Sequence, residues 1–214
     1  MGLLSLLNTD PMLILPYLGA IFSALTIHEF SHGYIAKING DDTAERLGRL
    51  TLNPIKHIDP IGAIMLFLVG FGWAKPIPVN PNNFRNIKSG SVAVSFAGIG
   101  ANIIFGCFSL LSLSILINFF DISTANYLIK FLYFLAIINI SLFVFNLLPV
   151  PPLDGYRIIE AFFPVSFRRF APMIEQWGFI LILAIVFLTN IVSVLINLFI
   201  VILALIFRVD LTIF

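Results

Sequence analysis

The sequence predicts an all-α polytopic membrane protein with about four to five transmembrane helices, a short re-entrant segment and a small interfacial β-hairpin or strand. The first observation is composition, because 59% of the 214 residues are hydrophobic, only 11% are charged, and the mean hydropathy is +1.04. The second is that the apolar residues form runs as long as the ~20 residues that cross a bilayer. The third is that most charged residues gather between these runs.

We expect one membrane-embedded domain over residues 1–214, with its core at 12–155 and a surface segment followed by a further span at 156–214. The formal net charge of +1 gives no reason to expect nucleic acid as a partner, so the lipid bilayer is the expected surrounding. The segment Met1 to Asp10 has no basic residue ahead of its leucines, unlike a removable signal peptide. We therefore expect the first helix to be retained.

The first predicted span runs from Met12 to Ala36, and the polar segment that follows contains an alternating stretch, Gly48 to Pro54, which is typical of a short interfacial strand. The apolar run Ile61 to Trp73 gives only about 20 Å of helix, too short for a bilayer core of ~30 Å. We interpret it as a re-entrant or tilted half-span. The segment Lys75 to Pro81 is predicted to be an extended loop, because each proline keeps the preceding residue out of the helical region.

Two further spans are predicted at 92–120 and 128–148, joined by a turn too short to hold an inserted PDZ domain. The segment 156–176 mixes charged and aromatic residues, which fits either an amphipathic helix on the membrane surface or a plain connecting loop. The apolar run 179–207 is longer than one span needs. It predicts either a tilted helix or a helix that breaks near Thr189 and Asn190.

The first span contains the sequence H-E-x-x-H, formed by His28, Glu29 and His32. On a helix, residues i and i+4 share one face, so both imidazoles can bind one zinc ion, and Glu29 is placed to act on water at the metal. The alternative is that these are buried polar residues satisfied by neighbouring helices. Ionisable residues inside membrane helices are costly and usually functional, which favours the zinc site.

A catalytic zinc site needs three protein ligands and one open position, so the two histidines need a further partner. The candidates are His57, Asp59 and Asp154. Asp154 is favoured because it follows a proline-rich turn at 149–152 whose fixed φ angles would hold its carboxylate in place. The other two more plausibly belong to the polar interfacial loop.

The orientation follows from the basic residues. Seven Lys and Arg residues lie between Lys37 and Lys88 and three between Arg157 and Arg169, whereas the turn 121–126 has none. The positive-inside rule then puts both basic segments in the cytoplasm, so His28 and Asp154 both come to the cytoplasmic side. We expect a multi-pass protein of a prokaryotic plasma membrane with its active site toward the cytoplasm.

Together, H-E-x-x-H and the sequence N-x-x-P-x-P-x-L-D-G at 146–155 resemble the site-2 protease family of intramembrane zinc metallopeptidases. The resemblance implies one Zn²⁺ per chain with His28, His32 and Asp154 as ligands. It further implies that Glu29 is the catalytic base and that Asn146 helps near the substrate carbonyl. The segment 98–102 is similar to the family's G-x-x-x-N element, which adds Asn102 as a substrate-binding residue. The likeness covers residues 12–155.

The expected function is hydrolysis of peptide bonds in transmembrane proteins or peptides, within or near the cytoplasmic side of the bilayer. A substrate helix must unwind first, and its extended backbone could then pair with the edge of a strand at 48–52. A membrane zinc transporter is one alternative, but its polar residues should mark a route across the membrane, whereas here they cluster at one face. A catalytically silent adaptor is another, and zinc binding alone would not need Glu29.

Overall fold

The computed structural model describes residues 10–70, 72–162 and 171–213. Within these ranges the residues form helices and no β-sheet, with one isolated bridge between Ile58 and Ala74, so the all-α class is confirmed. In chain order the elements are η1 (Pro11–Leu13), α2 (Ile14–Ile38), α3 (Thr43–Arg46), η2 (Pro54–His57), α4 (Pro60–Val69), η3 (Pro81–Asn83), α5 (Ile87–Asn118), α6 (Tyr127–Asn146), α7 (Asp154–Phe162), α9 (Ala171–Leu188), α10 (Ile191–Phe207) and η4 (Leu211–Ile213).

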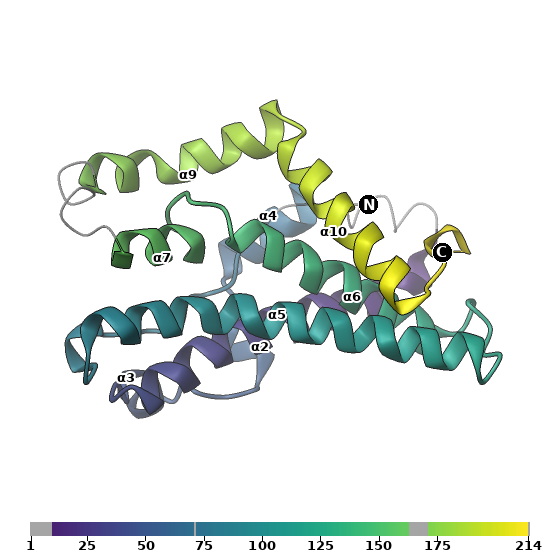
Figure 1. Cartoon of the computed structure of the whole chain (residues 1–214), viewed down its shortest axis with the longest axis horizontal. Helices are drawn as coiled ribbons and strands as arrows, with labels where there is room; N and C mark the ends of the chain where they lie inside the picture. Colours follow the sequence, from purple (N-terminus) through teal and green to yellow (C-terminus); the bar gives the residue numbers. More distant parts are fainter. Residues whose placement is uncertain (1–9, 71, 163–170, 214) are drawn as a thin grey trace.

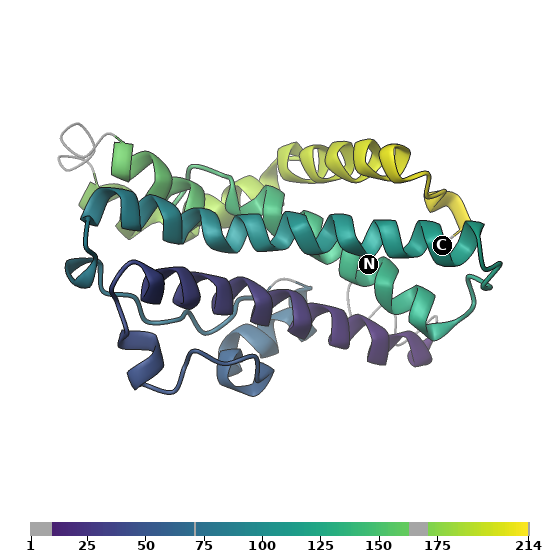
Figure 2. The same cartoon turned by 60° about the horizontal axis from the view of Figure 1, so that its bottom comes forward.

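Helices α2, α5 and α6 form the central bundle, in which each packs against the other two (Figures 1 and 2). A core of large aliphatic side chains joins α5, α6 and α10, and Leu110, Leu113, Ile129 and Ile140 lie at its centre. Each bundle helix, counting η1 with α2, is long and apolar enough to cross a membrane. The chain therefore has the build of a multi-pass membrane protein.

The two later spans begin at polar caps. The side chain of Asn86 accepts a hydrogen bond from the Ser89 N–H at 3.0 Å, so α5 begins at Ile87 and not at Val92 as predicted. The side chain of Asn126 caps α6 in the same way. Hydropathy marks the membrane-compatible part of a helix, whereas its first turn is set by capping, which explains the difference.

The strand predicted at 48–54 is wrong. Gly48 has φ +63°, and the N–H groups of Arg49 and Leu50 both donate to the Ala44 carbonyl, at 2.8 and 3.2 Å. These bonds fold the segment back onto the end of α3, so its backbone is not extended along a partner strand. The alternating pattern here belongs to a turn, and it leaves no strand edge at 48–52 for a substrate to join.

The short apolar run forms a helix followed by a return, as the half-span prediction required. Asp59 caps α4 by accepting the N–H groups of Ile61 and Gly62, each at 2.9 Å. Gly70 ends the helix in the left-handed conformation with φ +76°. The returning backbone then packs so closely on Gly62 that a Cβ there would lie 2.2 Å from the Trp73 carbonyl oxygen. That this unit enters a membrane stays a prediction.

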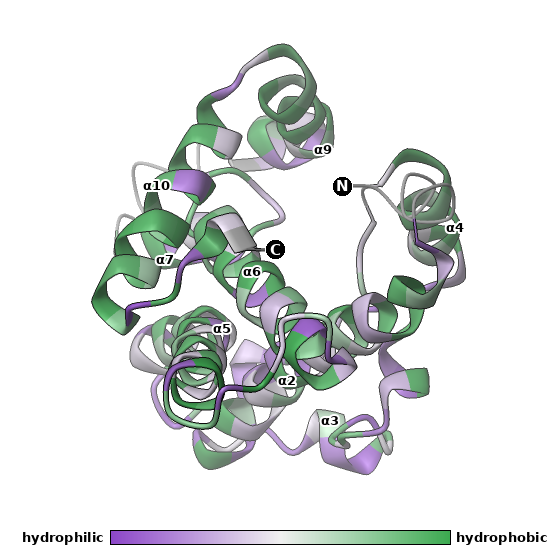
Figure 3. Ribbon diagram, turned by 90° about the vertical axis from the view of Figure 1, so that its right-hand side faces the viewer, coloured by the Kyte–Doolittle hydropathy of each residue, from purple (hydrophilic) through white to green (hydrophobic). Residues whose placement is uncertain are grey.

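The C-terminal apolar run is broken, as one of the two alternatives predicted. α9 and α10 meet at Thr189 and Asn190 with a bend of 70°. Residues 156–162 lie in α7 and 171–176 in α9, while 163–170 fall outside the described residues. If the bent pair counts as one span, the described residues hold four spans, the lower end of the expected number. Figure 3 shows that α4, α9 and α10 are mostly hydrophobic, whereas polar residues gather around α3.

Candidate metal centre

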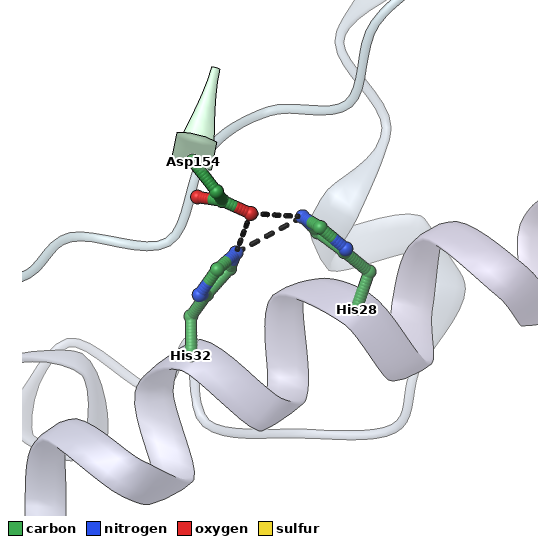
Figure 4. A group of neighbouring side chains, drawn as sticks. All are labelled: His28, His32 and Asp154. Carbon is green, nitrogen blue, oxygen red and sulfur yellow. Dashed lines mark hydrogen bonds and ion pairs between the residues drawn. The ribbon is translucent and has the colours of Figure 1, made fainter. Parts of the chain in front are cut away.

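Helix α2 presents the two histidines of H-E-x-x-H on one face, and α7 brings the third candidate ligand to them. The Nε2 atoms of His28 and His32 lie 2.9 Å apart, and Asp154 Oδ2 lies 3.4 and 3.3 Å from them. Figure 4 shows the carboxylate of Asp154, at the first residue of α7, pointing toward both rings. All three residues are buried, at 7% to 8% exposed. The fold thus joins residues that are more than a hundred positions apart in the sequence.

Hydrogen bonds on the far side of each ring fix the tautomer of both histidines. His32 Nδ1 donates to the backbone carbonyl of Val94 at 2.7 Å, since a carbonyl can only accept. His28 Nδ1 donates to Asn102 Oδ1 at 2.6 Å, and Asn102 Nδ2 in turn donates to Asn139 Oδ1 at 2.9 Å. With both Nδ1 atoms protonated, the neutral rings turn bare Nε2 lone pairs toward each other.

This arrangement fits a zinc ion. Two nitrogen lone pairs and a carboxylate oxygen face one another with no proton between them, which is repulsive unless a cation lies among them. Asp154 Oδ2 is also buried without a hydrogen-bond partner. Two imidazoles and one carboxylate are a usual ligand set for catalytic zinc, and imidazole ligands typically donate their other N–H to a carbonyl or carboxylate. Among the described residues this is the one metal-compatible group of three or more His, Cys, Asp or Glu side chains.

Helix α5 crosses α2 at the metal centre, and Gly98 makes this approach possible. A Cβ at Gly98 would lie 2.5 Å from His32 Nε2 and 2.6 Å from His28 Cε1, distances that no real Cβ tolerates. The absence of a side chain therefore leaves room for both rings. The G-x-x-x-N element thus has two parts with separate contacts, because Gly98 packs on the rings and Asn102 bonds one of them.

Glu29 is held by a loop that sequence reasoning did not connect to the site. Its Oε2 accepts the Ile77 N–H at 2.7 Å, and the carboxylate is buried in the same cavity as the histidines. The guanidinium of Arg49 donates to the carbonyls of Lys75 and Pro76, at 2.9 and 3.1 Å, and so fixes the backbone just before Ile77. A residue pattern does not reveal which backbone N–H will bind a side chain, although the prolines around Ile77 did predict an extended loop.

The far end of this loop is tied to the end of α2 by Asp41. Its carboxylate accepts the Asn80 N–H at 2.7 Å, the Asn83 side-chain amide at 2.7 Å, and both the N–H and the hydroxyl of Thr43. Burial raises the pKa of Asp41, but the hydrogen bonds from Thr43, Asn80 and Asn83 outweigh burial and hold this pKa below its ordinary value of 3.8. The loop is thus fixed at Ile77 and again at Asn80.

The remaining sequence-predicted residues lie in different surroundings. Asn146 is partly buried, lines the cavity and donates from Nδ2 to the Leu142 carbonyl at 3.0 Å. Asn102 is 0% exposed and lies behind His28. His57 and Asp59 are not in the metal-compatible group, since His57 Nε2 bonds the Thr51 carbonyl and Asp59 caps α4.

The metal centre opens into a cavity of about 1150 Å³. Its walls come from α2, from the loop that contains Ile77, from the first half of α5, from the end of α6 and from α7 and α9. Most of the lining side chains are apolar, and the polar ones include His28, His32 and Asp154. A cavity of this size can hold several residues of an extended peptide.

Comparison with known proteins also indicates a zinc-dependent peptidase. Residues 63–189 match the family described as "Peptidase family M50". The chain is similar to "Putative zinc metalloprotease YwhC" of Bacillus subtilis, with 43% identity over 177 residues, which cover 81% of each chain. It is also similar to "Putative zinc metalloprotease Rip2" of Mycolicibacterium smegmatis, with 30% identity over 85% of this chain and 73% of that one.

A more distant relative is "Zinc metalloprotease MJ0392" of Methanocaldococcus jannaschii, which is 30% identical over 141 residues. This match covers 66% of the present chain but only 32% of the archaeal protein. No solved structure matches the chain.

Proposed function

Because the chain belongs to peptidase family M50, the site-2 protease family, and is a zinc metalloprotease, we propose that it hydrolyses peptide bonds of membrane-spanning substrates toward the cytoplasmic side of the bilayer. The observation that carries the proposal is the convergence of His28, His32 and Asp154 beside the buried carboxylate of Glu29. Substrates would be transmembrane proteins or peptides, in keeping with a site built on three apolar helices.

We assign one zinc ion per chain to His28 Nε2, His32 Nε2 and Asp154 Oδ2. When bound there, zinc would supply Lewis-acid chemistry, polarising both a water molecule and the peptide carbonyl. The protein itself orients these ligand atoms. Val94 and Asn102 keep the Nδ1 protons on the outer side of the rings, so the lone pairs needed for metal binding always face inward.

Glu29 acts as general base and then as general acid. The Ile77 N–H holds Oε2, so Oε1 takes the proton from the attacking water and later delivers it to the leaving amine. Two hydrogen bonds from Arg49 hold the backbone before Ile77 in place. The Arg49 guanidinium therefore positions the base through the carbonyls of Lys75 and Pro76 and the N–H of Ile77.

The two asparagines take different roles in this proposal. Asn146 lines the cavity, and its side chain can turn from the Leu142 carbonyl to the oxygen of a substrate carbonyl, where an N–H donor would stabilise developing negative charge. Asn102 is fully buried against His28 and orients that ring instead of contacting substrate. This differs from the substrate-binding role that the resemblance suggested for Asn102.

Replacing Glu29 with Gln tests the proposed reaction. The substitution keeps the size of the side chain and removes the proton acceptor, so zinc should remain while cleavage of a single-span test substrate falls by ~10² to 10⁴. Zinc is measured by metal analysis and cleavage by mass spectrometry after reconstitution in liposomes. Equal cleavage by wild type and Glu29→Gln would refute the assignment of the base.

The orientation has its own test. In a Cys107→Ser background, single cysteines at Arg46 and Ser123 are exposed to a membrane-impermeant thiol reagent in intact cells. Position 123 should react and position 46 should not. The reverse pattern would put the active site on the outer side.

A further inference from the structure

A second cavity of about 810 Å³ lies next to the catalytic one. It is lined by α2, α4, α6 and the start of α10, and nearly all of its surface is apolar. The two cavities share wall residues, among them Leu25, Trp73, Leu142 and Phe145. The two cavities are therefore direct neighbours with part of their walls in common. Figure 3 shows α4 standing apart from α10, with α6 between them.

Two residues that line this second cavity each carry a buried polar atom without a hydrogen-bond partner. Thr26 Oγ1 and His57 Nδ1 are both without a hydrogen bond, and the two residues are 4% and 2% exposed. An unpaired buried donor or acceptor is strongly unfavourable, so such groups call for an explanation. The hydroxyl of Ser141, in the same cavity, follows the usual pattern of a helix and donates to the carbonyl four residues earlier, Ile137, at 2.7 Å.

The chemistry of the missing partner follows from the His57 ring. His57 Nε2 lies 2.8 Å from the Thr51 carbonyl, so Nε2 carries the proton and Nδ1 is a bare acceptor. A partner must therefore offer an N–H or O–H donor. A lipid ester carbonyl has neither and would leave Nδ1 unpaired. The Thr26 hydroxyl can both donate and accept, so it suits a group that combines a donor with an acceptor.

The position of these atoms ties them to the reaction. Thr26 precedes His28 by two residues on α2, about 3 Å along the helix axis, so it lies at nearly the depth of the metal ligands. Its neighbour Leu25 lines both cavities. A substrate whose unwound segment enters the catalytic cavity would place the adjoining part of its span beside Thr26.

We propose that Thr26 and His57 form a hydrogen-bonding subsite for a polar side chain, a carboxamide or a hydroxyl, within the membrane span of the substrate near the bond that is cleaved. The inference rests on the proposed function, because it takes the second cavity to hold the span of the substrate. It gives the enzyme a way to distinguish a span with an internal Asn, Gln, Ser or Thr from a purely aliphatic one. Neither residue contacts the metal centre, so the subsite selects substrate without taking part in the chemistry.

The test uses Trp73, which lines both cavities, as a reporter. The chain has two tryptophans, so Trp177→Phe leaves Trp73 as the only one. Two synthetic single-span peptides rich in Leu and Ala carry a nitroxide quencher and differ only at one central residue, Asn or Leu. Both are titrated into liposomes that contain the protein with Glu29→Gln, so that binding is measured without cleavage.

For each protein variant, the affinity for the Asn peptide is divided by the affinity for the Leu peptide. These ratios are then compared between variants, because any difference in how the two peptides insert into lipid is the same for every variant and cancels. The Asn peptide should bind about three to ten times more tightly, as expected for two hydrogen bonds in a membrane. Thr26→Val, which is isosteric, should reduce this preference by about threefold. His57→Gln, whose amide can still donate to the Thr51 carbonyl, should reduce it similarly. Ser141→Ala is the matched control and should leave the preference intact.

Several outcomes would overturn the subsite. These are equal affinities in the starting protein, a preference unchanged by both Thr26→Val and His57→Gln, the same loss in Ser141→Ala, or no quenching of Trp73 by either peptide. Zinc-dependent cleavage by protein with intact Glu29 is measured separately. Its absence would count against the proposed function, whereas a changed or unchanged binding ratio speaks only to Thr26 and His57.

Discussion

Two buried carboxylates in this protein have opposite surroundings. Asp41 is 1% exposed, and the contacts that the structure describes for its oxygens all come from N–H or O–H donors. Asp154 is 8% exposed, and its Oδ2 faces two imidazole lone pairs without a hydrogen bond. A carboxylate surrounded by donors holds parts of the fold together, whereas one surrounded by acceptors needs a cation. Burial alone would not have separated the two.

The largest effect is expected at Asp154. Asp154→Asn keeps the shape of the side chain and removes its charge, so zinc affinity should fall by more than the ~10 to 100-fold typical of losing an outer hydrogen-bond partner. Cleavage should be lost with it. The metal-free variant should unfold at the same temperature as metal-free wild type or higher, because a repulsion is gone. Competition for zinc with a chelator measures the loss of zinc affinity. If Asp154→Asn kept its normal zinc content at low free metal and turned over substrate normally, Asp154 would not be a ligand.

A second large effect is expected at the close helix crossing. Gly98→Ala puts a Cβ into the histidine rings and should weaken zinc binding by about 10 to 100-fold, comparable with the loss of an outer-shell partner. Gly100→Ala is the matched control, since a Cβ there meets nothing within 4 Å. Both helix positions gain the same propensity advantage from alanine, so the difference between the variants reports the crossing. Equal zinc affinity in the two variants would show that the rings do not depend on Gly98.

A smaller effect is expected at Arg49. Arg49→Gln removes the guanidinium that holds Lys75 and Pro76, so the Ile77 N–H should hold Glu29 less firmly. We expect kcat to fall about tenfold, part of the ~10² to 10⁴ that a positioned base supplies, with little change in KM or zinc content. Arg46→Gln is the control, because among the described residues the Arg46 side chain pairs with Asp42 at the surface. A loss confined to KM, or an equal loss in both variants, would contradict the positioning role.

The smallest effect on activity is expected at Asp41, where the change should appear in stability. Asp41→Asn should cost about 1 to 3 kcal/mol, since a buried hydrogen-bonded carboxylate is replaced by a poorer acceptor. The pKa of Asp41 is lower in the folded chain than its ordinary value, so its contribution is present above that value. The contribution is lost as pH falls through the lower folded pKa. The stability difference between wild type and variant should therefore narrow toward the acid end when unfolding curves are measured from about pH 7 to pH 3. A constant gap would mean that Asp41 titrates normally.

Patterns that depend on one helix or one run of residues were predictable from the sequence. The i, i+4 spacing put His28 and His32 on one face, and the apolar runs gave the bundle helices. The excess length of 179–207 left a tilted helix and a break near Thr189 as alternatives, and the structure has the break. The strand at 48–54 failed because alternation of residue type does not reveal that Ala44 already accepts two of its N–H groups.

Contacts made by backbone groups or by the absence of a side chain were not predictable. Ile77 binds the Glu29 carboxylate through its backbone N–H, which every residue except proline has. The need for glycine at position 98 becomes apparent only when α5 is seen to cross α2 at the histidine rings. The unpaired atoms of Thr26 and His57 are likewise visible only after every neighbour is in place. Residue types alone left His57 among the three candidates for the third ligand, with Asp154 favoured, whereas its position on the second cavity suggests a different use.

X-ray absorption spectroscopy at the zinc edge is the most direct test of the metal centre. We predict one zinc per chain, bound by two imidazole nitrogens and otherwise by oxygen ligands. The oxygen contribution to the spectrum should change in Asp154→Asn. Sulfur at about 2.3 Å would indicate Cys107, and a third imidazole would indicate His57. Either result, or a wild-type spectrum unaltered by Asp154→Asn, would contradict the ligand set of His28, His32 and Asp154.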